Sequence, residues 1–481
     1  MAQPEHTRGP TARQRTWRLM RCGALVFSVV ASVALSGAAE TMSTDDGTMW
    51  VGVTHGQYSA DSWSKPAAVA RARAILQASF PLQNQHIMGW GAMNPEPSNG
   101  VYDFGSLDAR VKLMRATGDT MVLTLCCSPD WMKGGAAGST DWSALEKAPL
   151  AAHFDDFAKL AATVARRYPD VKRFLVWNEL KGFFDPVRNT WDIEAYTILY
   201  NKVYDALKAV DASIQIGGPY VPMDSWTSPP AANRSSVAGP WGVVDQRSLD
   251  AITYWLAHAH GADFIAVDGG TGTRDQPDAQ PSIAQNGKFS AINAWLRGVT
   301  SLPIWWAEMH LGQAEDQPDA ASADMLESAL ATQAASGAAV VLLWQPEGTL
   351  TGCRLCMWTS TREATGGMAS APYLAVAPAL SAQPVAATDF GVAPVIDSPV
   401  DSAPTSTMAT TVSPSGGSGG ASQPTGLSSV DGAIDALIVP TGPTGVVSEA
   451  PSIATAVRLC LQVGEAVGGS LELEQLCVSS S

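Results

Sequence analysis

Two glutamates stand where their carboxylates could act on one bond. Glu179 ends the segment Phe-Leu-Val-Trp-Asn-Glu, and Glu308 ends the segment Leu-Pro-Ile-Trp-Trp-Ala-Glu. Each segment is a short apolar run, which predicts a buried strand with a carboxylate at its carboxyl end. Two carboxylates at one edge of a sheet can act as general acid/base and as nucleophile. That is the pair of groups that retaining hydrolysis of a glycosidic bond requires.

The segments that must position these glutamates alternate between strand-like and helix-like patterns from residue 49 to residue 380. Strands are expected over residues 49–54, 86–90, 120–126, 172–177, 214–218, 264–267, 302–307 and 338–344. Helices are expected between them, over residues 65–79, 107–117, 153–168, 193–210, 249–259, 289–299 and 321–336. Eight strands in series predict an α/β fold, a closed (β/α)8 TIM barrel, in which catalytic side chains come from the carboxyl ends of the strands.

The barrel accounts for only part of the 481 residues. Residues 1–39 combine a basic region, an apolar run and small residues, the layout of a secretory signal peptide, with an uncleaved anchor as the alternative. Residues 381–426 are rich in Ser, Thr, Pro, Gly and Ala, which predicts a linker because such a segment buries little apolar surface. Residues 427–481 are expected to form a disordered tail or a small appendage stapled by Cys460 and Cys477.

The charge of the chain limits its partners. A net charge of −15 and a pI near 4.8 argue against nucleic acid and against anionic membranes, both of which attract basic surfaces. Neutral or cationic substrates suit such a protein better. The mature protein is expected to be secreted or at the cell surface, with no stable membrane span after signal removal and with its oligomeric state left open.

No metal or organic cofactor is expected, because the chain lacks GxGxxG, P-loop and HExxH motifs. Six cysteines remain after removal of the signal peptide, and an even number in an exported chain indicates disulfides. Cys353 and Cys356 are spaced as CxxC, which fits a local disulfide or two plain thiols better than a zinc site. Cys126 and Cys127 are interpreted as small buried residues at the end of the third strand.

Four segments at the expected strand ends resemble glycoside hydrolase clan A. Two are the tripeptides Trp-Asn-Glu, ending at Glu179 after the fourth strand, and Trp-Ala-Glu, ending at Glu308 after the seventh. Residues 94–108 resemble a segment common in the clan after the second strand. Residues 128–131, Ser-Pro-Asp-Trp, are similar to the β-xylosidase and α-L-iduronidase branch, which is family 39-like. The likeness covers residues 49–380.

This resemblance implies a role for each residue of the motifs. Glu179 would be the proton donor, Glu308 the nucleophile and Asn178 the partner of the substrate 2-hydroxyl. Trp344, at the end of the eighth strand, matches the place where clan members hold an aromatic platform under the sugar. Further candidates for contact with a sugar are His55, Gln57, Asn94, Glu96, Trp131, Asp268 and His310.

The chain departs from the clan at two strand ends. Asp268 stands after the sixth strand, where many members carry a His or Tyr that supports the nucleophile. Many members also carry an Arg at the second strand, and none is visible there in this sequence.

The sequence therefore predicts an exported retaining glycoside hydrolase, without cofactor, that acts on a polysaccharide or glycoconjugate. A non-catalytic carbohydrate-binding TIM barrel at the cell surface is the first alternative. A cell-surface structural protein, whose linker matters more than its barrel, is the second. If the site is catalytic, repulsion between two close carboxylates should leave one of them protonated near neutral pH.

Overall fold

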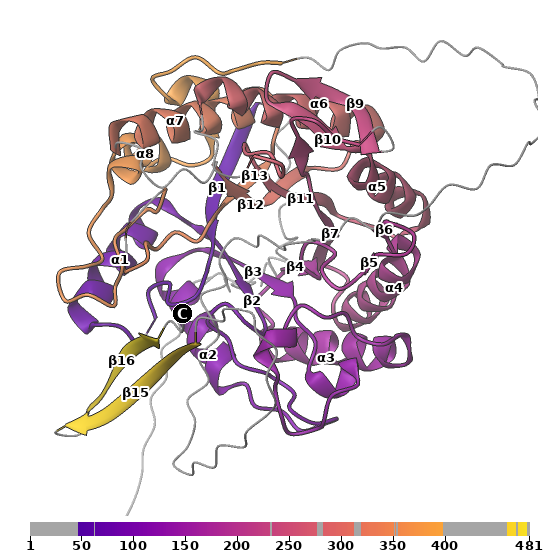
Figure 1. Ribbon diagram of the computed structural model, residues 1–481, viewed down its shortest axis with the longest axis vertical. Coiled ribbons are helices and arrows are strands. Elements are labelled where there is room, and N and C mark those ends of the chain that lie inside the picture. Colours follow the sequence, from indigo (N-terminus) through magenta and orange to yellow (C-terminus); the bar gives the residue numbers. More distant parts are fainter. Residues whose placement is uncertain are drawn as a thin grey trace, which may run out of the picture. The chain divides into compact units, whose positions relative to one another are not determined.

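The computed structural model describes residues 47–61, 63–230, 233–276, 282–311, 319–350, 352, 355–397, 459–467 and 470–478. Between residues 47 and 397 parallel strands form a sheet that closes on itself (Figure 1). In chain order the barrel strands are β1 (Thr48–Thr54), β2 (Leu82–His86), β3 (Thr120–Leu125), β4 (Arg173–Val176), β7 (Gln215–Pro222), β11 (Phe264–Gly270), β12 (Ile304–His310) and β13 (Val340–Trp344). Parallel pairing of β13 with β1 closes the barrel. The predicted (β/α)8 barrel is confirmed.

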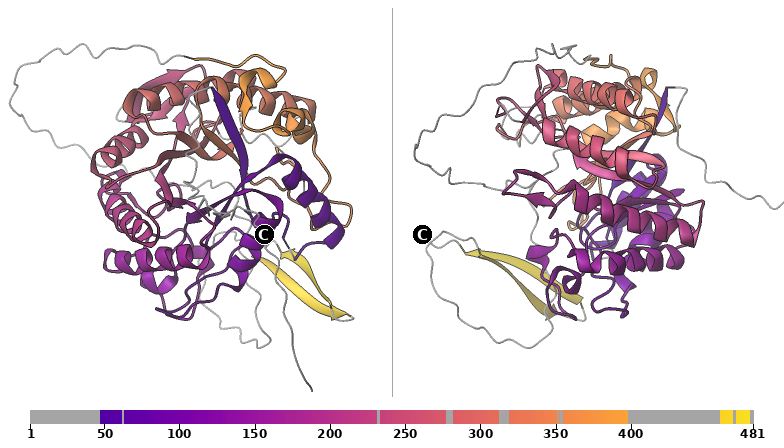
Figure 2. Two further views of the ribbon diagram at one scale, coloured as in Figure 1. Left: turned by 180° about the vertical axis from the view of Figure 1, so that it is seen from behind. Right: turned by 90° about the vertical axis from the view of Figure 1, so that its right-hand side faces the viewer.

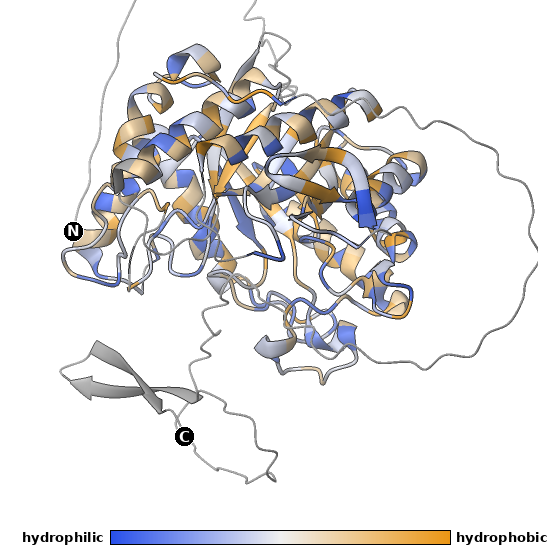
Figure 3. Ribbon diagram, turned by 45° about the horizontal axis from the view of Figure 1, so that its top comes forward, coloured by the Kyte–Doolittle hydropathy of each residue, from blue (hydrophilic) through white to orange (hydrophobic). Residues whose placement is uncertain are grey.

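Helices connect the strands and surround the barrel, as both views in Figure 2 show. They are α1 (Pro66–Ser79), α2 (Gly105–Thr117), α3 (Phe154–Arg167), α4 (Ile193–Val210), α5 (Gln246–His258), α6 (Gly287–Val299), α7 (Asp319–Ala335) and α8 (Ala371–Leu380). Hydrophilic and hydrophobic residues alternate along these helices (Figure 3). In α3 the fully buried side chains recur at three- and four-residue spacing, which places them on one face: Phe157, Leu160, Ala161 and Val164.

Shorter strands lie in the connections and beyond the barrel. β5 (Phe184–Asp185) pairs with β6 (Thr190–Trp191), and β10 (Gly242–Asp245) pairs with both β8 (Ser225–Trp226) and β9 (Arg234–Gly239). β14 (Val385–Ala386) pairs antiparallel with β1. By itself, the hairpin of β15 (Leu459–Val467) and β16 (Ser470–Val478) places Cys460 opposite Cys477.

The chain stays packed on the barrel beyond the boundary expected at residue 380. β14 lies within the segment that was expected to be a linker, and Trp241 donates its indole N–H to Asp397 at 3.0 Å. The expected signal peptide, residues 398–458 and residues 479–481 lie outside the described residues. In the part of the chain that the structure describes, no helix is both long and apolar enough to cross a membrane.

The second strand begins four residues earlier than expected, at Leu82 rather than at His86. Its sequence, Leu-Gln-Asn-Gln-His, lacks the apolar pattern of a buried strand, yet every residue of it is buried. Hydrogen bonds make this possible, because Asn84 bonds to Thr54 at 3.1 Å and to Thr124 at 3.0 Å on the neighbouring strands. This polar pattern explains why the strand was placed too late.

Large side chains fill the interior of the barrel. The rings of Phe264 and Trp305 stack with centroids 4.0 Å apart. Gly217 makes room for them, since a Cβ at that position would lie 2.0 Å from the Phe264 ring. A (β/α)8 barrel is a packed core rather than a pore, so substrates must bind at the carboxyl ends of the strands.

Candidate active site

Three strands deliver carboxylates to the carboxyl end of the barrel. Glu179 follows β4, Asp268 lies in β11 and Glu308 lies in β12. Oxygen atoms of the three carboxylates lie within 4.8 Å of one another. Asp268 and Glu308 are paired in register, so the parallel ladder itself places them side by side. Asp268 is 2% exposed and Glu308 is 5% exposed, whereas the Glu179 side chain is 21% exposed.

The backbone that carries Glu179 adopts an unusual conformation. Trp177, Glu179 and Leu180 have φ angles of 68°, 47° and 52°, in the left-handed region that costs a non-glycine residue about 1–2 kcal/mol. Trp177 holds this turn, because its indole N–H donates to the carbonyl of Lys181 at 2.7 Å and its ring packs on Phe157. Strain of this kind gathers at functional sites, where the surrounding packing maintains it.

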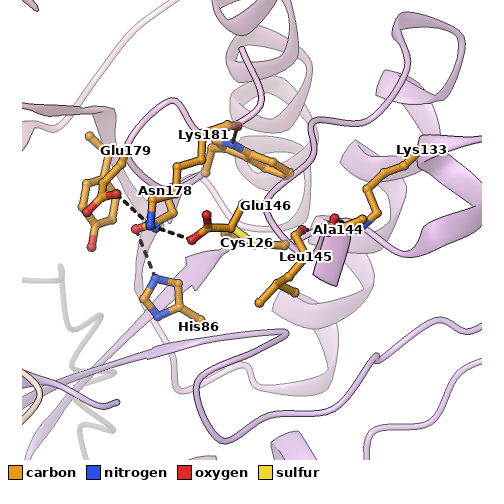
Figure 4. Close-up of a disulfide and its surroundings, with 12 residues drawn as sticks. His86, Cys126, Lys133, Ala144, Leu145, Glu146, Asn178, Glu179 and Lys181 are labelled. Atoms are coloured by element: carbon orange, nitrogen blue, oxygen red, sulfur yellow. Dashed lines mark hydrogen bonds and ion pairs between the residues drawn. A yellow bond between two sulfur atoms is a disulfide. The ribbon is translucent and has the colours of Figure 1, made fainter. Parts of the chain in front are cut away.

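Lys181 brings a positive charge to the site (Figure 4). Its ammonium lies 2.9 Å from Glu179, 2.5 Å from Glu146 and 5.8 Å from the centre of the Trp90 ring. Burial by itself would raise the pKa of Glu179, but the Lys181 ammonium and a hydrogen bond with Asp268 lower that pKa to about 2. Glu179 is therefore an ionised carboxylate in this structure.

Asp268 holds the proton of its hydrogen bond with Glu179. Two carboxylates have no donor between them, so one of the pair must be protonated. Burial raises the pKa of Asp268 well above its ordinary value, and the negative charge of Glu179 raises it further. Asp268 is thus the donor, and its Oδ1 atom is buried with no hydrogen-bond partner among the described residues.

Tyr220 and His86 hold Glu308. Tyr220, in β7, donates its hydroxyl to Glu308 Oε1 at 2.6 Å. The Nε2 atom of His86 lies 3.6 Å from the same oxygen and 3.3 Å from Oδ1 of Asn178. Burial lowers the pKa of His86 to about 3, so its imidazole is neutral. Burial and the charge of Glu179 raise the pKa of Glu308, while the hydrogen bond from Tyr220 acts in the opposite direction.

Aromatic rings form a wall beside these carboxylates. The rings of His86 and Trp90 lie with centroids 4.3 Å apart, and each lies 6.3 Å from the ring of Trp344. Trp90 and Trp344 are partly exposed, so their apolar surface is open to a ligand. An aromatic wall opposite polar groups is suited to a sugar, which has apolar C–H faces and a polar rim.

The structure brings together most of the residues that the sequence singled out. Asn178, Glu179, Asp268, Glu308 and Trp344 all lie at the carboxyl end of the barrel. His310 ends β12 beside them and is exposed. Its ring lies against the backbone of Gly270, where an added Cβ would meet the ring at 2.3 Å. Contact of each residue with a sugar stays a prediction.

Two other predicted residues do not contact the carboxylates. His55 is fully buried, and its ring nitrogens bond to Ser59 at 2.8 Å and to Gln83 at 3.0 Å. Trp131 donates its indole N–H to the carbonyl of Glu96 at 2.9 Å. The polar atoms of both side chains are therefore already hydrogen-bonded to other groups of the same chain.

The remaining candidates, three residues in the connections after β1 and β2, are also placed. Asn94 accepts a hydrogen bond from the backbone of Glu96 at 3.0 Å, and Glu96 accepts one from Gly100 at 2.8 Å. These contacts shape the connection after β2. Gln57 lines a small surface cavity with Trp63 and Trp142.

Sequence reasoning missed His86, Tyr220 and Lys181 as members of the site. His86 was missed because the second strand was placed too late, which put the imidazole at the strand's beginning instead of its end. Tyr220 was missed because the fifth strand was ended at Gly218, whereas β7 continues to Pro222. His86 and Tyr220 both lie near the carboxyl end of a barrel strand, which is the signal that could have identified them. Lys181 stands two residues after Glu179 and could have been found from that spacing.

Cys126 and Cys127 are buried, as expected, and a disulfide also joins them. Both residues follow β3 and are fully buried, and the disulfide lies near Glu146 (Figure 4). Cys356 is also disulfide-bonded, and its expected pairing with Cys353 stays a prediction. Cys353 lies outside the described residues.

Among the described residues, the three carboxylates are the one group of acidic, His or Cys side chains close enough together to hold a metal ion. Lys181 already places an ammonium 2.9 Å from Glu179. Burial and the charge of Glu179 raise the pKa of Asp268, which favours a proton on that carboxyl. Carboxyls with such neighbours are suited to acid–base and nucleophilic chemistry.

No protein-family model and no curated protein matches the chain. Solved structures do, and one is a monomeric β-xylosidase from Caulobacter crescentus CB15, with 16% identity over 68% of this chain and 67% of that one, and a TM-score of 0.48. A family 39 β-xylosidase from Caulobacter crescentus has 15% identity over 68% and 70% of the two chains, with a TM-score of 0.46. An endo-1,4-β-xylanase from Penicillium canescens has 13% identity over 72% and 97%, with a TM-score of 0.46.

Proposed function

We propose that this protein is a retaining glycoside hydrolase. The observation that carries the proposal is the approach of Glu179 and Glu308, whose carboxylate oxygens lie within 4.8 Å at the ends of two barrel strands. Carboxyl groups about 5–5.5 Å apart are typical of retaining enzymes, whereas inverting enzymes leave room for a water at about 6.5–9.5 Å. The short separation supports direct attack by one carboxylate on the sugar.

The surroundings of the two glutamates support a different role for each. Glu308 is the more deeply buried glutamate and receives the Tyr220 hydroxyl, which steadies it as the nucleophile. Glu179 is the more exposed of the two, which suits a group that protonates the leaving oxygen. Glu308 attacks the anomeric carbon, the glycosidic bond breaks and the leaving oxygen takes a proton through Glu179. Water then attacks the glycosyl ester, its proton leaves through Glu179, and Glu308 is released as a carboxylate.

Asn178 and the aromatic wall would bind the sugar. The Asn178 amide, held by His86 at 3.3 Å, is placed to bond the 2-hydroxyl, a contact that strengthens in the transition state. Trp90 and Trp344 would cover an apolar face of the ring. We extend the proposal to an exported enzyme that acts on a polysaccharide or glycoconjugate, as the N-terminal basic and apolar pattern indicates.

The test uses the full-length protein and 4-nitrophenyl β-D-xylosides, β-D-galactosides and α-L-iduronides, with a polysaccharide panel alongside. We expect turnover by the wild type, and NMR should show that the first-formed product keeps the anomeric configuration of the substrate. Glu308→Gln should lower kcat by a factor on the order of 10³ or more, because the nucleophile is lost. Glu194→Gln, which changes an exposed carboxylate on α4, is the control and should be unaffected.

The outcomes separate the candidate functions. Activity that is equal in the wild type and Glu308→Gln would overturn the assignment of the nucleophile. Inversion of the anomeric configuration would overturn the retaining mechanism. A wild type that hydrolyses nothing but binds polysaccharide as tightly as Glu308→Gln would favour the non-catalytic barrel.

A further inference from the structure

The acid proton of this site has an unusual location. A retaining enzyme needs a protonated acid at the leaving oxygen, yet Lys181, at 2.9 Å, keeps Glu179 ionised. Lys181 is itself held in place by Glu146 at 2.5 Å, so the ion pair is built into the connections after β3 and β4. Glu179 alone would thus be a poor acid near neutral pH, because its own proton is lost at low pH.

Asp268 lies where it can supply the proton that Glu179 lacks. Its carboxyl is hydrogen-bonded to Glu179 and lies within 4.8 Å of Glu308. The groups that face it are Glu179 and Lys181 from the connection after β4, Tyr220 from β7, Glu308 from β12 and Lys288 from α6. Lys288 donates to the carbonyl of Gly270 at 2.7 Å, and Lys181 bonds to Glu179 and Glu146, so neither lysine is hydrogen-bonded to Asp268.

We propose that Asp268 stores the catalytic proton and that Glu179 delivers it, an inference that rests on the proposed function. In the first step Asp268 gives its proton to the ionised Glu179, and Glu179 passes that proton on to the leaving oxygen. Glu308 meanwhile forms the ester bond and loses its negative charge, and Asp268 gains one. In the second step a proton of the attacking water passes to Glu179 and from Glu179 to Asp268, while the ester bond breaks and Glu308 regains its charge.

The proximity of Asp268 and Glu308 drives this exchange. While Glu308 is ionised, its charge within 4.8 Å favours the protonated form of Asp268. Once Glu308 is esterified that charge is gone, and Asp268 can remain ionised until the ester is hydrolysed. The negative charge of the site therefore moves between two adjacent strands, and the ion pair of Glu179 with Lys181 is the same at the beginning and end of each step.

The proposal makes Asp268 a residue that acts through Glu179, and Asp268→Asn tests it. The amide can still donate a hydrogen bond to Glu179 but cannot supply a proton. For methyl glycosides, whose leaving group needs protonation, we expect kcat/KM to fall roughly 10²–10³-fold. For 2,4-dinitrophenyl glycosides of the same sugar, whose leaving group departs as an anion, the change should stay within about threefold. The basic limb of the pH profile should move to lower pH, because Glu179 must then hold the proton itself.

If the proposal holds, a second substitution should partly reverse the loss of activity and the shift of the basic limb in Asp268→Asn. Lys181→Met, added to Asp268→Asn, removes the charge that keeps Glu179 ionised, so the basic limb should return toward higher pH and part of the methyl glycoside activity should reappear. Asp224→Asn is the matched control, since Asp224 follows the neighbouring strand β7 and lies 3.6 Å from Arg274. In this control the ratio of kcat/KM for methyl glycosides to that for 2,4-dinitrophenyl glycosides should equal the wild-type ratio.

Four results would overturn the proposal. One is an equal loss for both kinds of leaving group with an unmoved basic limb, which would make Asp268 a structural residue. Another is a folded Asp268→Asn variant whose kcat/KM values and pH profile equal those of the wild type. If that variant does not fold, Lys181→Met alone decides: the basic limb should stay near its wild-type position because Asp268 holds the proton, and a limb that moves to much higher pH would show that Glu179 holds the proton itself. A wild type active on glycosides and silenced by Glu308→Gln would keep the proposed function even then, whereas an inactive wild type would overturn both.

Discussion

At the scale of single residues, neighbours decide which carboxyl of the site carries charge. Glu179 and Glu308 are both glutamates at strand ends, but Lys181 lies 2.9 Å from the first and the Tyr220 hydroxyl 2.6 Å from the second. The cation lowers the pKa of Glu179 to about 2, whereas burial keeps the pKa of Glu308 well above its ordinary value. Identical side chains thus acquire different chemistry from their partners.

Tyr220→Phe tests how Glu308 is held ready for attack. The hydroxyl favours the ionised form of Glu308, so its loss should raise the pKa of Glu308 further. In the proposed mechanism Glu308 is the nucleophile and must be ionised, so the acid limb of the kcat/KM profile should move to higher pH. We also expect kcat to fall roughly 10-fold to 100-fold, as for the loss of one hydrogen bond to a charged group. An acid limb that does not move would show that Tyr220 does not influence the ionisation of Glu308.

At the scale of elements, the connections after the strands are held by side chains that have no part in the chemistry. Glu347, after β13, is 4% exposed. It accepts hydrogen bonds from the backbone of Ala60 at 2.7 Å, from the indole of Trp358 at 2.9 Å, and from the amide and hydroxyl of Thr361, both at 2.6 Å. One carboxylate therefore ties the connection after β1 to the connection after β13, on either side of the seam that closes the barrel.

Glu347→Ala should destabilise the barrel. It would leave buried donors without an acceptor, at a cost of about 2–4 kcal/mol in the free energy of unfolding. Glu363→Ala, in the same connection but exposed, should change that free energy by less than about 0.5 kcal/mol. Denaturant unfolding of both variants decides the matter, and equal stabilities would show that the hydrogen bonds of Glu347 contribute nothing net.

At the scale of the whole molecule, the site works against the stability of the barrel. Asp268 and Glu308 are buried carboxyls whose pKa values are raised by burial, so keeping them ionised in the folded state is unfavourable. A folded pKa above the unfolded value means that the folded state binds the proton more tightly. Stability is then lost as the pH rises from the unfolded pKa through the folded one.

Glu308→Gln should accordingly stabilise the protein while it abolishes activity. We expect a gain of about 0.5–2 kcal/mol near neutral pH, visible as a higher Tm. Below the unfolded pKa the gain should shrink, because the native glutamate is then protonated in both states. Thermal unfolding at several pH values gives the comparison, and a Tm that is lower in the variant at every pH would contradict this account.

Much of the fold follows from local patterns in the sequence. Apolar runs and amphipathic spacing indicate seven of the eight barrel strands and the helices between them, since both signals depend only on neighbours along the chain. Glu179 and Glu308 could be found for the same reason, because each directly follows such a run. The second strand shows the limit of these patterns: its buried Gln, Asn and His residues are held by partners on other strands, so its polar sequence concealed it.

Tertiary structure alone decided how the site is charged and assembled. Asp268 meets Glu179 because β11 stands near β4 in the barrel, and Tyr220 reaches Glu308 from a strand 88 residues away along the chain. Hydrogen bonds and charges act over a few ångströms through space, whatever the separation in sequence. The sequence by itself therefore determined which elements form and which glutamates end them. Closure of the barrel determined which carboxyl holds the proton, because only closure sets the distances between those groups.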